Sequence, residues 1–317
     1  MIDFSYLANK IIKSDFSEKP FKHIYIENFL HEKHFKAIIE SNEIESPKNI
    51  KNDKELIYGL YDKGFSPINF PGSAKNSSEY LEWRKNRNNI KPKHSACEGF
   101  GFVLRLHKIE TPIILSLNEY IRGEQFNKVL AEKFDLNENK LIQDGGIQKY
   151  LDGYEISPHA DTRSKALTFM VNINPSDESE IMNHHTKYMK LVKKRDYVQK
   201  FWEGNPEIDR EWLPWNWLTT EKTQNKNNSI VIFSPNNDTF HAVLADYNHL
   251  ITQRTQLYGN LWFDKKHSKT INWENLDLIS NSQTKGPIKS KNSISFKSIK
   301  NFFKSNSGNK RVKRNMP

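Results

Sequence analysis

The sequence predicts a β-sandwich or jelly roll flanked by N-terminal helices, an α+β protein whose core is mainly β. Two patterns of apolar residues along the chain lead to this prediction. Up to about residue 140, several segments carry apolar residues at helical spacing. Beyond residue 141 the chain consists mostly of short runs rich in β-branched and aromatic residues. Helices followed by a set of short strands are typical of a sheet core with helices packed beside it.

The N-terminal part, residues 1–140, is expected to form helices and strands that pack on the core. Residues 45–100 are rich in Asn, Lys, Ser, Gly and Pro, which predicts irregular loops with short elements. The longer elements expected here are a helix at 3–16, a strand at 21–30, a helix at 31–44 and a helical pair at 112–121 and 124–134, broken at Gly123.

The core is expected at residues 141–270. Its predicted strands lie at 145–151, 154–161, 166–174, 228–235 and 254–263. Asp152-Gly153 separates the first two strands, and this dipeptide favours a type I′ turn, so we expect a β-hairpin there.

An insertion at about 175–226 interrupts the predicted strands. It contains Trp202, Trp212, Trp215 and Trp217 among charged residues. The insertion is expected to form a lid or a wall of the substrate site, or else simply to pack its aromatic side chains onto the core.

The charge is unevenly distributed along the chain, which has a formal net charge of +10. Residues 281–317 hold ten Lys or Arg and no Asp or Glu, so positions 1–280 keep 38 basic residues against 38 acidic ones. A domain that binds a nucleic-acid groove is expected to carry the basic excess on its own surface. The body of this chain is therefore not expected to bind nucleic acid.

The basic tail at 281–317 is expected to be disordered, because it is rich in Ser, Asn and Lys and has no acids. The alternative is a short basic amphipathic helix on an anionic surface, since Phe296, Ile299 and Phe303 recur at helical spacing.

A cytoplasmic location is expected from three features of the chain. No stretch approaches the roughly 18 apolar residues of a membrane span, and the N-terminus has no apolar signal core. Cys97 is the only cysteine, which fits a reducing compartment.

The run YEISPHADTR, residues 154–163, holds the first candidate site residues. In an extended chain alternate side chains point to the same side, so His159 and Asp161 project together while Ala160 points away. Such a pair is a metal site, a hydrogen-bonded pair or a coincidence, and the spacing alone is weak evidence.

His241 and Arg254 flank the end of the predicted core. His241, in the run FHAV, is either a metal ligand or a hydrogen-bonded core residue. Arg254 opens the last strand, and a buried guanidinium needs an anionic partner. That partner is either a protein carboxylate or a ligand carboxylate, which the two-pronged guanidinium holds well.

The remaining histidines give weaker signals. His184 and His185 are a ligand pair by residue type, but no expected strand holds them. His23 and the other histidines in polar or mixed contexts are expected to be exposed or to cap helices.

His159, Asp161, His241 and Arg254 together fit one chemistry. Two imidazoles and one carboxylate on one face of an iron ion leave three coordination positions open. A 2-oxo acid can chelate two of these positions and dioxygen can take the third. The far carboxylate of the 2-oxo acid then needs a cation on a neighbouring strand.

Four runs resemble the successive core motifs of Fe(II)- and 2-oxoglutarate-dependent dioxygenases: YLDGYEISPHAD, ALTFMVNIN, SIVIFSPNNDTFHAV and QRTQLYGNLWF. The prolyl-4-hydroxylase-like branch looks most similar, and PFKHIYIENFLHEKHFKAIIES looks like the family's N-terminal strand–helix segment. The residues that match the branch pattern are Tyr150, Gly153, Pro158, His159 and Asp161. The resemblance covers about 147–174 and 229–263 and leaves the insertion unmatched.

The resemblance implies a double-stranded β-helix, the jelly roll also found in cupins, and the oxidative decarboxylation of 2-oxoglutarate to succinate. It implies Fe(II) held by His159, Asp161 and His241, with 2-oxoglutarate as cosubstrate and ascorbate as a candidate further cofactor. Arg254 would pair with the distal carboxylate of the cosubstrate, where that branch often has Lys. Tyr150 would donate a hydrogen bond to the same carboxylate, or else be a packed core aromatic.

Two further residues qualify the resemblance. Gln256, on the same strand face as Arg254, occupies a position where other branches have Ser, so its cosubstrate-binding role departs from the family pattern. Asp161 stands where the halogenating branch has Gly or Ala, which disfavours halogenation.

The predicted function is therefore hydroxylation of an unactivated C–H bond, with peptidyl proline, an amino acid, a sugar and other metabolites all open as substrates. The alternative is a non-catalytic jelly-roll protein that binds a ligand, with His159 and Asp161 as structural residues. A nucleic-acid demethylase of the same fold would need a basic body, which the charge count contradicts. The oligomeric state is left open.

Overall fold

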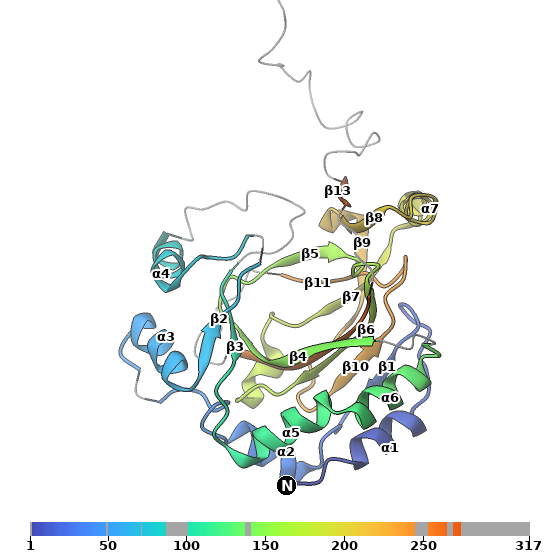
Figure 1. The fold of residues 1–317 in the computed structure, drawn as a ribbon. Helices are drawn as coiled ribbons and strands as arrows, with labels where there is room; N and C mark the ends of the chain where they lie inside the picture. Colours follow the sequence, from blue (N-terminus) through green and yellow to red (C-terminus); the bar gives the residue numbers. More distant parts are fainter. Residues whose placement is uncertain are drawn as a thin grey trace, which may run out of the picture. The chain divides into compact units, whose positions relative to one another are not determined.

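Two antiparallel sheets that face each other form the framework of the chain in the computed structural model (Figure 1). The residues that the structure describes are 2–48, 50–70, 72–86, 101–136, 141–244, 253–264 and 269–273. They all belong to one unit that spans residues 1–275. The predicted tail at 281–317 and Cys97 lie outside the described residues.

In the part of the chain that the structure describes, the larger sheet has seven strands, and every neighbouring pair in it is antiparallel. In spatial order its strands are β1 (Ile24–Ile26), β10 (Ile230–Phe233), β6 (Lys165–Asn172), β12 (Arg254–Phe263), β4 (Leu141–Tyr150), β3 (Val103–Leu106) and β2 (Phe65–Pro67). The two longest strands, β4 and β12, pair over their whole length without a register shift.

The smaller antiparallel sheet has four strands, in the order β5 (Ile156–His159), β11 (His241–Val243), β7 (Lys187–Leu191) and β9 (Leu218–Thr223). A parallel pair lies beside it, formed by β8 (Ile208–Trp212) and β13 (Lys269–Asn272). β7, β8 and β9 come from the segment predicted as an insertion. That segment is therefore part of the sheet framework and not only an addition to it.

Several N-terminal helices cover the outer face of the larger sheet, whereas the last helix lies beside β8 and β9 (Figure 1). The described helices are α1 (Tyr6–Lys13), α2 (Glu32–Ile39), α3 (Asp53–Asp62), α4 (Ser77–Asn86), α5 (Pro112–Arg122), α6 (Glu124–Lys133) and α7 (Tyr197–Gly204). The short 3₁₀ turns η2 (Asp177–Ile181), η3 (Lys193–Arg195) and η4 (Trp215–Trp217) lie in the segment at about 175–226 that was predicted as an insertion, called the former insertion below. Among the described residues, every helix is too short or too polar to cross a lipid bilayer.

The alternation of side chains along the larger sheet separates an apolar outer face from a polar inner face. Leu257 and Leu261 of β12 and Ile147 of β4 belong to the main apolar cluster, which also contains residues of the helices. Because side chains alternate along a strand, Arg254 and Tyr258 point to the other side. We call the side of the larger sheet that faces the smaller sheet the inner face.

The predicted hairpin at Asp152-Gly153 is wrong. β4 pairs with β3 and β12, whereas β5 pairs with β11, so the turn carries the chain from one sheet to the other. The Tyr154 N–H donates to the Leu151 carbonyl at 3.1 Å, and Gly153 has a φ of 90° while Asp152 has no positive φ. One positive φ at the third position is the signature of a type II turn, not a type I′ turn.

Helix α4 holds this turn in place and explains why no hairpin forms. The Tyr80 hydroxyl donates to the Asp152 carbonyl at 2.8 Å, and the Arg84 guanidinium pairs with the Asp152 carboxylate. A β-carbon on Gly153 would collide with the Trp83 indole. The turn is therefore fixed by contacts from a segment far away in the sequence.

The described residues between 45 and 86 hold two ten-residue helices, α3 and α4, in a region expected to be loops with short elements. Both helices begin with the same side-chain cap. Asn52 accepts from the Glu55 N–H at 3.0 Å, and Asn76 accepts from the Glu79 N–H at 3.0 Å. An Asn followed three residues later by Glu is a sequence signature of a helix N-terminus. The prediction missed it because the region as a whole is polar.

Candidate metal centre

Strand pairing brings the two predicted histidine ligands together. His159 is the last residue of β5 and His241 is the first residue of β11, and the two are direct partners in the antiparallel register. Asp161 follows two residues after His159, just past the end of β5. The prediction that both residues lie late in the strand or at its end is thus confirmed for His159, whereas Asp161 lies two residues beyond the strand.

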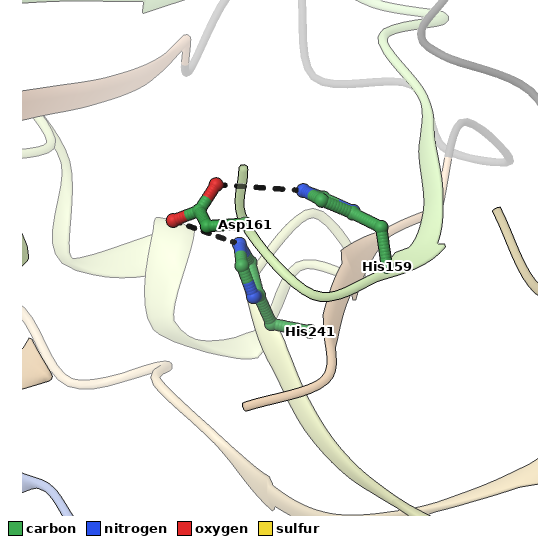
Figure 2. A group of neighbouring side chains, drawn as sticks. All are labelled: His159, Asp161 and His241. Atoms are coloured by element: carbon green, nitrogen blue, oxygen red, sulfur yellow. Dashed lines mark ion pairs between the residues drawn. The ribbon is translucent and has the colours of Figure 1, made fainter. Parts of the chain in front are cut away.

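The three side chains converge on one point (Figure 2). Ligand atoms from His159, Asp161 and His241 all lie within 4.8 Å of one another. Asp161 turns one carboxylate oxygen to each imidazole, with Oδ1 3.8 Å from Nε2 of His159 and Oδ2 4.0 Å from Nε2 of His241. These distances exceed hydrogen bonds and leave room for an ion between the donors.

Both imidazoles are oriented in the same way by the backbone. Nδ1 of His159 lies 2.8 Å from the carbonyl oxygen of Ser157, and Nδ1 of His241 lies 3.0 Å from that of Thr239. A carbonyl only accepts, so Nδ1 carries the proton in each ring and Nε2 keeps its lone pair. This is the tautomer that a metal ligand requires, fixed by the second ring nitrogen.

The Asp161 carboxylate is held by two side chains of β6. Lys165 Nζ lies 2.8 Å from Oδ1, and the Thr168 hydroxyl donates to Oδ2 at 2.8 Å. A carboxylate has about four lone-pair sites, so these two bonds leave acceptor capacity for an ion. No sequence pattern singled out Lys165 or Thr168, because their role depends on where β6 passes the loop after β5.

The ionisation states of the three groups also fit a metal centre. Burial lowers the pKa of His159 well below its ordinary value, and the neighbouring His241 adds to this. Burial likewise lowers the pKa of His241. Burial alone would raise the pKa of Asp161, but Lys165 and the two imidazoles outweigh it and hold that pKa well below its usual range. At neutral pH the group therefore offers two neutral imidazoles and one carboxylate, the state that binds a divalent metal.

Arg254 lies in the interior between the two sheets. It is 2% exposed, and its guanidinium donates to the Thr186 hydroxyl at 2.8 Å, just before β7. The ring of Tyr150, its direct register partner, lies 4.4 Å from the guanidinium carbon. Within the described ranges no carboxylate pairs with Arg254, and its Nε has no hydrogen-bond partner. A buried guanidinium in this state fits the carboxylate of a ligand.

The orientation of Gln148 determines what Tyr150 can do. The Arg105 guanidinium has only donors, so the Gln148 amide turns its oxygen to Arg105, at 3.2 Å, and its nitrogen to the Tyr150 hydroxyl, at 2.7 Å. In this orientation the Tyr150 hydroxyl accepts from Gln148. This is compatible with the predicted hydrogen bond to a cosubstrate, which stays a prediction.

Gln256 lies on the inner face, and its amide orientation is also fixed. Asn172 Nδ2 donates to two backbone carbonyls, of Gln224 at 2.8 Å and of Lys226 at 3.1 Å. The oxygen of Asn172 therefore accepts from Gln256 Nε2, at 2.9 Å. Gln256 Oε1 is left buried with no partner among the described residues. A carboxylate has no proton to donate to this oxygen, so the free Gln256 Oε1 does not support binding of the cosubstrate carboxylate. The cosubstrate role of Gln256 stays a prediction.

The tryptophans of the former insertion divide between the metal centre and ordinary packing. Trp212 lies against the metal centre, with its ring 4.9 Å from the ring of His159. Trp217 is buried in a separate aromatic cluster, and the Arg163 guanidinium lies over Trp202 at 4.0 Å. Trp215 donates to the Glu155 carboxylate at 3.0 Å. Only Trp212 of the four therefore touches a ligand residue in the part of the chain described.

The other histidines do not join the group in the described part of the chain. His184 and His185 are buried just before β7, and His185 Nε2 lies 2.6 Å from the Ser179 carbonyl oxygen. His23 was expected to be exposed or capping, and this is wrong, because it is only 1% exposed. It packs against Phe21 and Tyr188 in a small aromatic cluster.

Comparisons with known proteins give likenesses of fold at low identity. No family model matches the chain, and no curated protein matches it. A prolyl-4-hydroxylase of Pseudomonas putida is similar over 82% of this chain and 98% of its own, at 9% identity and a TM-score of 0.40. An oxidoreductase of the 2OG-Fe(II) oxygenase family from Burkholderia pseudomallei is similar over 69% of this chain and 94% of its own, at 8% identity and a TM-score of 0.30.

A third likeness is to HygX of Streptomyces hygroscopicus, whose structure holds nickel, 2-oxoglutarate and hygromycin B. It extends over 68% of this chain and 88% of that one, at 10% identity and a TM-score of 0.29. These matches accompany the resemblance seen in the sequence. Because identities and TM-scores are low, they assign no function, and the proposal below is built on the side chains of this chain.

Proposed function

We propose that this chain is an Fe(II)- and 2-oxoglutarate-dependent dioxygenase with a double-stranded β-helix framework. In the proposed reaction, dioxygen and 2-oxoglutarate convert a substrate C–H bond to C–OH and yield succinate and CO2. One oxygen atom enters the product and the other enters succinate. Iron, when bound, would supply the activation of dioxygen that the side chains of the protein cannot provide.

The observation that carries the proposal is a three-donor group in the same inter-sheet space as a buried guanidinium that no carboxylate of the described residues pairs with. His159, His241 and Asp161 present two neutral nitrogens and one carboxylate on one side, the facial set that suits Fe(II) with open positions. Arg254 supplies the cation that the distal carboxylate of 2-oxoglutarate would need.

Each side chain has a distinct role in this proposal. His159 and His241 would bind the metal through Nε2, and Lys165 and Thr168 would keep the Asp161 carboxylate ionised and aimed at the same point. The three ligand residues are each less than a tenth exposed. The protein therefore keeps bulk water away from the reacting centre and stabilises the charges there.

Two measurements test the proposal. Adding Fe(II) and 2-oxoglutarate without oxygen should produce a weak visible charge-transfer band. Admitting labelled dioxygen should then place one label in succinate. A protein that binds the metal but forms neither the band nor succinate would instead be the non-catalytic ligand-binding protein. The predicted need for ascorbate is tested by repeating the succinate assay with and without it.

A further inference from the structure

The inner face of the larger sheet carries rows of polar side chains that run away from the metal centre. The register aligns Thr168 of β6 with Asn260 of β12 and Asp144 of β4. Thr168 Oγ1 is bonded to the Asp161 carboxylate at 2.8 Å and lies 3.1 Å from the Asn260 amide. This row therefore starts at a metal ligand residue and extends across the sheet.

A second row lies on the same face, four residues away along β12, and is hydrogen-bonded in two pairs. It consists of Asn172, Gln256, Gln148 and Arg105, which are register partners on four neighbouring strands. Gln256 bonds to Asn172 at 2.9 Å, and the Gln148 amide oxygen accepts from Arg105 at 3.2 Å. Both rows offer amides, hydroxyls and charged groups where most sheet interiors offer apolar side chains.

A gap opens between the two rows at Gly146. This glycine is the register partner of Tyr258, and a β-carbon built on it would meet nothing within 4 Å. The Arg105 guanidinium donates to the Tyr258 hydroxyl, so these two side chains reach towards each other over the glycine. A glycine inside a strand often marks a place where a ligand approaches the backbone closely.

The charges around this gap cancel. Arg105 Nη1 lies 3.4 Å from Asp144 Oδ1, and these side chains are 27% and 42% exposed. A substrate in the gap would therefore meet a donor and an acceptor side by side, with no net charge. An anionic group would be attracted by Arg105 and repelled by Asp144, so the pair does not select it.

Unsatisfied hydrogen-bonding capacity points to the kind of group that completes the site. Gln256 Oε1 is buried and lacks a donor among the described residues, and Asp144 accepts further donors. A hydroxyl both donates and accepts, so it can serve Gln256 or Asp144 as a donor and Arg105 as an acceptor. An apolar ring such as that of proline would leave Gln256 Oε1 unpaired, which costs about 1–3 kcal/mol for a buried polar group.

From this arrangement we propose that the inner face between Gln256 and Asp144 is the substrate subsite, and that the substrate is a neutral, hydroxyl-rich small molecule such as a sugar or other polyol. The inference rests on the proposed dioxygenase function and narrows its substrate. Asp144 and Tyr258 act as specificity-determining residues, because they bind the substrate and not the iron.

The test compares three panels on the protein loaded with Fe(II) and 2-oxoglutarate: neutral sugars and polyols, free amino acids, and proline-containing peptides. We expect polyols alone to accelerate succinate formation and to gain one oxygen by mass. Acceleration by the peptides or amino acids and not by the polyols would overturn the inference and leave the dioxygenase function intact. Saturation-transfer NMR measures polyol binding independently of turnover, and it decides the inference even if no iron–cosubstrate band appears.

Variants make the test specific to the subsite. Asp144→Asn should weaken binding of the most active polyol by about 10- to 100-fold, the effect of losing a hydrogen bond to a charged group. Asp53 is the matched control, since it is 46% exposed and pairs at 2.8 Å with Arg84, which belongs to neither row. Equal polyol affinity in Asp144→Asn and Asp53→Asn would refute the subsite. Tyr258→Phe provides the same test if Asp144→Asn does not fold.

Discussion

His159 and His241 face each other as register partners on neighbouring antiparallel strands, with their rings 4.4 Å apart. Two residues far apart in the sequence are thus held together by the backbone hydrogen bonds of β5 and β11. A ligand pair built into a sheet in this way needs no metal to assemble it. The centre is therefore preformed. Substituting one of its ligand residues should affect metal binding more than folding.

The first prediction follows from that preformed pair. His241→Ala should abolish the visible band formed with Fe(II) and 2-oxoglutarate, because two donors alone cannot hold the metal in the facial geometry. His23→Ala is the matched control. His23 is equally buried and its Nδ1 also contacts the carbonyl two residues earlier, at 2.8 Å, but it lies outside the donor group.

An anaerobic titration with Fe(II), followed by absorbance, measures the effect in both variants. Loss of the band in both variants would mean that it reports general destabilisation, and a band retained in His241→Ala would remove His241 from the metal centre.

The second prediction concerns the cosubstrate. Arg254→Met should weaken 2-oxoglutarate binding by about 2 kcal/mol or more, roughly 30-fold, because the distal carboxylate would be buried without its cation. The matched control is Arg195→Met, since Arg195 is 4% exposed and its guanidinium also lies over an aromatic ring, that of Trp217, at 4.1 Å. Calorimetric titration of 2-oxoglutarate into the metal-loaded protein measures the difference. Unchanged affinity in Arg254→Met would mean that another residue pairs with the distal carboxylate of 2-oxoglutarate.

The third prediction separates a hydroxyl from a methyl group at the same position. Thr168→Val removes the donor to Asp161 Oδ2 but keeps the shape of the side chain. Metal affinity should fall by about 10-fold or more, as is usual when a group that orients a ligand residue is lost. Thr168→Ser keeps the hydroxyl and should retain most of the affinity. If Val and Ser variants bind the metal equally, the hydroxyl does not orient Asp161.

The residues of the candidate centre could be predicted because they lie on strands with clear patterns. His159 and Asp161 alternate in an extended run, and His241 and Arg254 follow or open buried strands, so their positions were readable without coordinates. Their partners were not readable. Lys165 and Thr168 reach Asp161 only because β6 runs beside the loop after β5, and that proximity depends on sheet order.

The errors in the fold have the same origin. Asp152-Gly153 has the local chemistry of a hairpin, but hairpin formation also requires the two flanking strands to pair. Here both edges of β4 are already paired, with β3 and β12. In addition, Arg84 of α4 binds Asp152. Long-range pairing therefore overrides a strong local preference. The same holds for the former insertion, in which β7 pairs with β11, the strand that carries His241.

The fourth prediction uses two glycines with opposite surroundings. Gly153→Ala should destabilise the protein by about 1–3 kcal/mol or more, because Gly153 has a φ of 90° and a β-carbon would strike the Trp83 indole. Gly59→Ala should instead stabilise it by about 0.5–1 kcal/mol, since Gly59 lies inside α3 with nothing within 4 Å of a β-carbon. Urea unfolding measures both. A stable Gly153→Ala variant would mean that the turn after β4 is not held as described.

The last prediction concerns a buried carboxyl group away from the metal centre. Glu211 of β8 is 1% exposed, its Oε2 accepts from the Trp273 indole at 2.8 Å, and its Oε1 has no partner among the described residues. Burial raises the pKa of Glu211 to about 8. The folded protein therefore keeps a proton on Glu211 that the unfolded chain loses near pH 4.5, the ordinary value.

The sign of the pH dependence follows from that difference in bound protons. Between about pH 4.5 and 8 the folded state holds more protons than the unfolded state, so raising the pH through this window lowers the free energy of unfolding. Glu211→Gln keeps the acceptor for Trp273 but cannot ionise. Relative to this variant, the unmodified protein should lose about 2–4 kcal/mol between pH 5 and pH 8. Urea unfolding at several pH values measures the two curves, and parallel curves would show that Glu211 is ionised in the folded protein throughout.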